Sequence, residues 1–118
     1  MFLSQEGCLL RIFIGESDRH DGQLLYEWIV KKARADGLAG ATVLRGIMGF
    51  GANSRVIHTF KIERLSEDLP VVIEIVDSRE RVEEFLNSID ERIEAGLATL
   101  ERAEVRFYRG IEGEGKGN

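Results

Sequence analysis

The order of apolar strands and amphipathic helices along the chain is the feature that most restricts its fold. Short apolar runs predict strands at residues 8–14, 41–50, 55–65, 71–76 and 99–108. Apolar residues at helical spacing predict one helix at 23–36 and a second between 77 and 96. Because each helix has a single apolar stripe, the pair can cover only one face of an antiparallel sheet, and right-handed crossovers then give a split βαβ arrangement. We therefore predict an α+β, ferredoxin-like sandwich.

Both predicted helices have recognisable ends. Asp21 is expected to cap the first helix by accepting from its free backbone N–H groups, and Gly37 to end it. Asp77 and Glu80 are expected to form a capping box at the start of the second helix. The apolar stripe of this second helix consists of Val82, Phe85, Leu86, Ile89 and Ile93.

The sheet face away from the helices carries too many apolar side chains to be left in water. If the even-numbered residues of 10–14 point toward the helices, this other face carries Leu9, Arg11 and Phe13. Arg11 is expected to pair there with Glu74 of a neighbouring strand. An apolar face with an internal ion pair predicts burial against other subunits. The alternative is an exposed sheet face with scattered apolar groups.

Length, charge and composition restrict the class of protein. The 118 residues fit one domain at 1–110, followed by a Gly-rich, charged tail at 111–118. The net charge of −5 argues against nucleic-acid binding. No apolar stretch approaches the ~20 residues of a membrane span, and the N-terminus lacks a basic start, so we expect a cytoplasmic protein without membrane insertion. The lone Cys8 is expected to be a reduced packing residue.

The sequence RGIMGFGANSR, residues 45–55, contains three glycines within six positions. Glycines let backbone N–H groups approach an anion closely, and consecutive N–H groups form an anion-binding nest. Asn53 and Ser54 add polar groups, and Arg55 adds a planar donor fork suited to phosphate. The alternative is a hairpin turn with bulges at the glycines.

Several motifs in order resemble the PII signalling proteins. GLAGATVLRGIMGFG, LSEDLPVVIEIVD and the opening LLRIFIGESDRHDGQLLYEWIV are most similar to a PII-like family catalogued as a domain of unknown function. The resemblance extends from Leu9 to Tyr108. It implies a homotrimer whose sheets face inward, with a ligand site in each cleft between neighbouring subunits. That site binds adenine nucleotides in PII proteins, which implies AMP, ADP or ATP as the ligand here and no required cofactor.

The resemblance also assigns residues to the nucleotide site. Gly49, Phe50 and Gly51 match the base of the mobile T-loop of PII proteins, and Thr42 matches a threonine that lines the adenine pocket. Arg106 matches the first of two C-terminal arginines that reach phosphates from the neighbouring subunit. Together with the polar groups named above, the expected nucleotide-binding residues are Thr42, Gly49, Phe50, Gly51, Asn53, Ser54, Arg55, Gly96, Thr99, Arg106 and Arg109.

The chain departs from the PII pattern at three places. Residues 96–99 stand where PII proteins have a longer, lysine-containing B-loop. Tyr108 takes the place of the second C-terminal arginine, with Arg109 next to it. An ordered hairpin at residues 49–65 is expected in place of the T-loop. These departures favour a nucleotide with fewer phosphates, or a different ligand.

Three classes of function are open at this point. The leading hypothesis is a sensor whose 49–65 hairpin reports ligand binding to a target protein, such as a transporter or an enzyme. The second is a small hydrolase or isomerase with His20 or His58 as its acid or base, although no catalytic residue set stands out. The third is a metal-responsive trimer like the copper-tolerance proteins, with ligands from one loop: Glu16, Asp18, His20 and Asp21.

Overall fold

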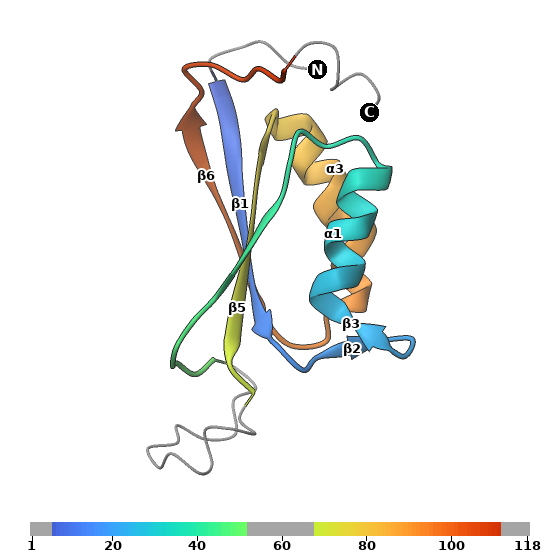
Figure 1. The fold of residues 1–118 in the computed structure, drawn as a ribbon. Coiled ribbons are helices and arrows are strands. Elements are labelled where there is room, and N and C mark those ends of the chain that lie inside the picture. The colour runs from blue at the N-terminus through green and yellow to red at the C-terminus, as the bar shows by residue number, and fades with distance from the viewer. Residues whose placement is uncertain (1–5, 52–67, 112–118) are drawn as a thin grey trace.

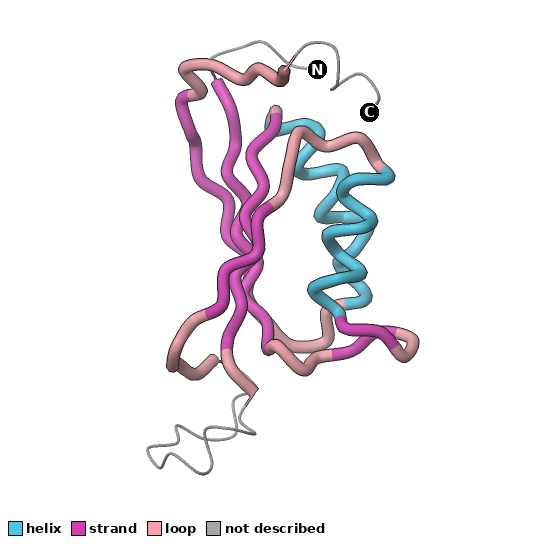
Figure 2. Tube along the Cα trace, in the orientation of Figure 1, coloured by secondary structure: helices cyan, strands magenta, loops and turns pink. Residues whose placement is uncertain are grey.

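The fold is one four-stranded antiparallel sheet with two helices packed against one of its faces (Figure 1, Figure 2). A computed structural model describes residues 6–51 and 68–111. The elements are β1 (Glu6–Gly15), β2 (Arg19–His20), β3 (Gln23–Leu24), α1 (Leu25–Ala35), β4 (Thr42–Arg45), β5 (Pro70–Asp77), α3 (Arg79–Ile89), the 3₁₀ turn η1 (Asp90–Arg92) and β6 (Leu97–Glu104). The sheet order is β4-β5-β1-β6. The predicted α+β, ferredoxin-like sandwich is confirmed, while the predicted strand at 55–65 lies outside the described residues.

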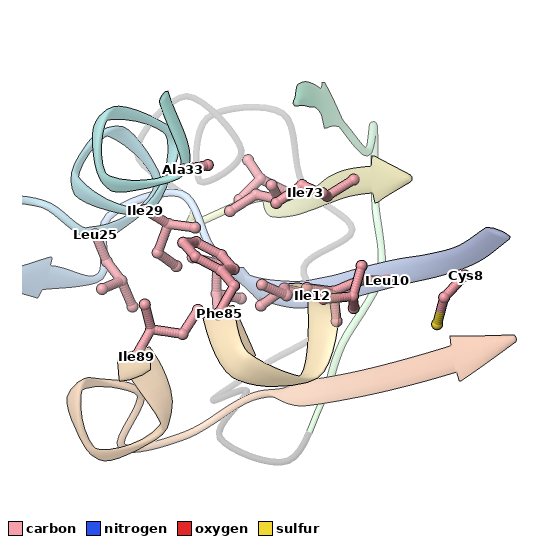
Figure 3. Packing of buried hydrophobic residues seen from close by; sticks show 13 residues of the cluster. Cys8, Leu10, Ile12, Leu25, Ile29, Ala33, Ile73, Phe85 and Ile89 are labelled. Carbon is pink, nitrogen blue, oxygen red and sulfur yellow. The ribbon is translucent and has the colours of Figure 1, made fainter. Parts of the chain in front are cut away.

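Strict alternation along β1 and β5 builds the core between the sheet and the helices. Leu10 and Ile12 of β1 and Ile73 and Ile75 of β5 are at most 1% exposed. They pack against the helix stripes (Figure 3), whose buried residues are Leu25, Ile29, Ala33, Val82, Phe85 and Ile89. Cys8 lies at the edge of this cluster, where burial raises the pKa of its thiol, in line with the packing role expected for it.

β1 and β5 extend one or two residues beyond the prediction at each end, and β4 and β6 differ from it most. β4 ends at Arg45 rather than residue 50, because the chain leaves the sheet after Gly46 donates its N–H to the Pro70 carbonyl at 2.7 Å. β6 begins earlier than predicted, at Leu97, because Gly96 allows a close approach to β1. A Cβ at Gly96 would lie 2.8 Å from the Phe13 carbonyl oxygen. β6 then ends at Glu104, and residues 105–111 turn across the end of the sheet (Figure 1).

Both predicted N-terminal helix caps are wrong, whereas Gly37, with a φ of 80°, follows the end of α1 as predicted. Asp21 has a φ of 52° and Gly22 a φ of 82°, so they form the tight turn between β2 and β3, for which Asp-Gly is a preferred pair. α1 instead begins after Leu24 without a side-chain cap. α3 is capped by Ser78, whose Oγ accepts from the backbone N–H of Arg81 at 3.3 Å. Neither helix of the described residues is long and apolar enough to cross a membrane.

Asp77 ties the α1–β4 connection to the start of α3. Its side chain is buried, and Oδ2 accepts from the backbone N–H of Ala39 at 2.9 Å while Oδ1 accepts from that of Ser78 at 2.7 Å. The Nε atom of Arg81 lies 3.3 Å from Oδ1. One buried carboxylate therefore holds two backbone segments and one cation in place.

We expect Asp77→Ala to lower the free energy of unfolding by about 2–3 kcal/mol, because it leaves the Ala39 N–H without its buried acceptor. The matched control is Asp36→Ala, which removes an exposed pair with Lys32 and should cost no more than about 1 kcal/mol. Denaturant unfolding at equal protein concentration measures both. Equal losses in the two variants would contradict the role assigned to Asp77.

Candidate ligand-binding site

The segment of residues 46–51, which follows β4, packs with two of its glycines against Pro70. A Cβ at Gly46 would lie 2.9 Å from Pro70 Cγ, and one at Gly49 would lie 3.3 Å from the same atom. Gly49 also has a φ of 153°, which side chains rarely adopt. Gly51 is different, since a Cβ there would meet no atom of the described residues within 4 Å. Close packing thus explains Gly46 and Gly49, while no described neighbour explains Gly51.

Large apolar side chains of the same segment point into solvent. Ile47 is 86% exposed, Met48 64% and Phe50 71%. The site prediction included Phe50, and its ring is available for contact with a ligand or with another subunit. Three further predicted residues, Asn53, Ser54 and Arg55, lie outside the described residues.

The loop after β1 holds the base of this segment. Glu16 accepts from Arg45 Nη2 at 2.6 Å, and its backbone N–H donates to the Leu69 carbonyl at 2.7 Å. The neighbouring Ser17 N–H donates to Asp68 Oδ1 at 2.7 Å. Two backbone donors of this loop therefore hold the chain entering β5, and the Arg45–Glu16 ion pair connects the same loop to the end of β4. Sequence reasoning missed Arg45, although its position directly before a glycine run was a usable signal.

Thr42 and Thr99 lie in one row across the sheet but at opposite edges. Thr42 is paired with Glu74, Glu74 with Arg11, and Arg11 with Thr99. Neighbouring strands are ~4.8 Å apart, so three spacings separate the two threonines by roughly 14 Å. Both face the side of the sheet away from the helices, here called the open face.

Gly96 lies at the same end of the sheet as Gly46, on the opposite edge. Next to it is a hollow of about 360 Å³ between the end of α3 and the start of β6. Its apolar lining includes Ile12, Leu86 and Leu97, with Asp90 and Glu94 also present. The predicted B-loop equivalent therefore borders a cavity, but it does not meet the glycine segment of the same chain.

The segment of residues 105–111, to which Arg106 and Arg109 belong, lies at the other end of the sheet (Figure 1). This segment follows β6 and reaches the α1–β4 connection, where Tyr108 Oη donates to the Ala39 carbonyl at 2.6 Å. The Arg109 guanidinium carbon lies 4.3 Å from the centre of the Phe107 ring. Within one chain, these arginines therefore lie far from the glycine segment.

Two of the four candidate metal ligands of residues 16–21, Glu16 and Asp18, have partners outside this set, whereas His20 Nε2 and Asp21 Oδ2 lie 3.4 Å from each other. Glu16 binds Arg45, and Asp18 accepts from the backbone N–H of Gly15 at 3.0 Å. The His20 ring packs edge-on against Trp28, with ring centres 4.6 Å apart, and Asp21 is largely exposed. Among the described residues, no group of three or more His, Cys, Asp or Glu side chains could hold a metal ion.

The open face combines an apolar row with an ion-paired row. Leu44, Val72, Phe13 and Leu97 lie side by side in register, and Leu44 and Leu97 are 49% and 57% exposed. In the next row, Arg11 Nε donates to Glu74 at 3.0 Å, which confirms the predicted pair, and Arg11 Nη1 lies 3.4 Å from Glu101. The hydrogen bond to Glu74 raises the pKa of Arg11.

This arrangement defines a ferredoxin-like fold of the PII type. CPII of Thiomonas intermedia K12, solved with ADP, AMP and acetate, superposes with a TM-score of 0.60 at 17% identity, covering 89% of this chain and 92% of CPII. CPII solved with ADP and bicarbonate gives a TM-score of 0.61 at 16% identity, over 88% and 90%. A putative PII-like signaling protein of Thermus thermophilus gives 0.57 at 23% identity, over 89% and 93%.

The chain belongs to the DUF190 family, described as Uncharacterized ACR, COG1993, whose family model matches residues 7–105. A UPF0166 protein of Aquifex aeolicus is 41% identical over 99 residues, covering 84% of this chain and 92% of the relative. A UPF0166 protein of Methanocaldococcus jannaschii is 41% identical over 103 residues, covering 86% and 92%. The resemblance to a PII-like family of unknown function is thereby confirmed.

We expect Gly96→Ala to destabilise the protein much more than Gly51→Ala does, because only Gly96 of the two packs closely against another described part of the chain. A Cβ at Gly96 meets the Phe13 backbone, so this variant should lose about 1–3 kcal/mol of stability. A Cβ at Gly51 meets no described atom within 4 Å, so its effect on stability should stay within about 0.5 kcal/mol. Thermal unfolding measures both. A strongly destabilised Gly51→Ala would contradict this difference in packing.

Proposed function

We propose that this protein is a PII-like sensor. It forms a homotrimer, binds an adenine nucleotide (AMP, ADP or ATP) in the clefts between subunits, and signals through residues 49–65 to a target protein such as a transporter or an enzyme. The observation that carries the proposal is the open face: the two helices leave this side of the sheet uncovered (Figure 1), and apolar side chains such as Leu44 and Leu97 are exposed on it.

The chemistry of the open face favours contact with copies of the same chain. Its apolar row would remain costly in water, while the guanidinium of Arg11 is already paired with Glu74 inside the subunit. When such a face is buried, the charge of Arg11 keeps its ion pair with Glu74. Three inward-facing sheets are the assembly that the PII resemblance implies.

The distribution of the candidate residues supports a site shared between subunits. Gly49, Gly51 and Gly96 lie at one end of the sheet, and Arg106 and Arg109 at the other, so a neighbour must supply the arginines. CPII, which has this fold, was solved with ADP in two structures. A nucleotide would then meet the backbone at Gly51 and cationic side chains of the next subunit.

Binding without turnover is the expected chemistry. His20 is the candidate acid or base that belongs to the described residues. Its ring packs against Trp28 and does not line the candidate site. A nucleotide can bind to backbone N–H groups and arginines without a metal ion or a cofactor.

Sedimentation of the wild-type protein at micromolar concentration should give about three times the subunit mass of 13.3 kDa. Leu97→Glu places a charge in the apolar row, and because Leu97 is 57% exposed in the subunit, the subunit should fold but fail to assemble. Asn87→Glu, on the exposed surface of α3, is the control and should leave the assembly intact. A monomeric wild type would refute the shared site.

Nucleotide binding should depend on the arginines at both parts of the site. We expect Arg55→Ala and Arg106→Ala each to weaken ADP binding by about tenfold, the loss of one charge-assisted hydrogen bond, while the trimer persists. Arg79→Ala, on the outer face of α3, is the control. A nucleotide at 100 times its dissociation constant should add about 2.7 kcal/mol of stability, which thermal shift detects. Unchanged binding in both variants would show that the site is misplaced.

A further inference from the structure

The Arg45–Glu16 ion pair stands beside the glycine segment and joins the end of β4 to the loop after β1. Glu16 is held from its backbone by the Leu69 carbonyl and is 27% exposed as a side chain. Arg45, at the end of the edge strand β4, has a side chain that is 62% exposed. The carboxylate is therefore the fixed partner of the pair, and the guanidinium is the partner open to solvent.

The Arg45 guanidinium has N–H groups that are not used in its hydrogen bond to Glu16. Arginine carries five N–H groups in a planar fork. Within the described part of the chain, the only acceptor for them is Glu16, which binds Nη2 at 2.6 Å. An exposed ion pair of this kind is weakly held, since water screens both charges. A phosphate dianion offers more charge and can accept two parallel hydrogen bonds from the fork.

We propose that Arg45 binds a phosphate group of the nucleotide and that Glu16 occupies this guanidinium when no nucleotide is bound. Glu16 acts as an internal competitor for the phosphate. Arg45 is thus a specificity-determining residue for nucleotides over nucleosides. This inference rests on the proposed function, because it assigns a further contact to the same site.

The position of the pair makes the exchange useful for sensing. Glu16 lies in the loop after β1. In this loop the Ser17 N–H donates to the Asp68 side chain, and the Asp18 carbonyl accepts at 2.8 Å from the N–H of Leu25, the first residue of α1. Release of Glu16 by a phosphate therefore changes the contacts of a loop that is connected to both β5 and α1.

The test compares two charge-neutralising variants of one ion pair. Arg45→Gln should weaken ADP binding by about tenfold, the loss of a charge-assisted hydrogen bond. Glu16→Gln should instead tighten ADP binding by about threefold, because the competitor is gone. Adenosine binding should change in neither variant, since adenosine has no phosphate. Titration calorimetry measures the affinities of the wild type and both variants for ADP and for adenosine.

A double variant shows whether Glu16 affects ADP affinity by pairing with Arg45 or only through the net charge near the site. If Glu16 competes only through Arg45, the gain from Glu16→Gln must disappear in the Glu16→Gln/Arg45→Gln protein. Arg79→Gln and Glu83→Gln, which neutralise the matched pair on α3, are the controls and should leave ADP affinity unchanged.

The outcomes distinguish this inference from the proposed function. Opposite effects of the two variants on ADP, lost in the double variant, support the exchange. Weaker ADP binding in both variants would mean that the pair is only structural and would overturn the inference while leaving the nucleotide site in place. A wild-type protein that binds none of AMP, ADP and ATP would overturn the proposed function and the inference together.

Discussion

The pairing of β1 with β5 on one side and β6 on the other determines how the rest of the subunit is arranged. In this register Leu10 lies opposite both Ile75 and Leu100, and Ile12 lies opposite Ile73. Because side chains alternate along a strand, the pairs that fill the core also determine which residues face away from it. A shift of one residue would exchange the two faces and expose the whole core, so the burial of these side chains strongly specifies the register.

The same register places charges on the open face where they compensate one another. Arg11 lies directly opposite Glu74, and their 3.0 Å contact follows from the strand pairing rather than from a loop conformation. An arginine buried without a partner would cost several kcal/mol, whereas a paired one costs far less. The open face therefore combines apolar area with a charge pair that is already satisfied, which is the combination expected of a surface that associates with its own copies.

Local patterns predicted the parts of the structure that depend on periodicity, namely the strand alternation, both helix stripes and the pair on the open face. The N-terminal caps were not predicted, because Asp21 and Asp77 each stand next to a residue better suited to the turn or the cap, Gly22 and Ser78 respectively. The candidate site was harder still, because its contacts join residues far apart in the sequence, as Arg45 pairs with Glu16 across 29 positions. The glycine run was recognised as unusual, but only the packing shows which of its glycines serve the fold.

Strand direction explains why a site built from these residues requires two subunits. β4 ends, and β6 begins, at the end of the sheet where β1 meets Pro70, while the segment after β6 emerges at the opposite end. A ligand that contacts the glycine segment of one subunit and the arginines of another must stabilise their interface by the same free energy with which the interface favours the ligand. Nucleotide binding and assembly are then thermodynamically linked. If a phosphate displaces Glu16 from Arg45, the breaking of that ion pair is coupled to both equilibria.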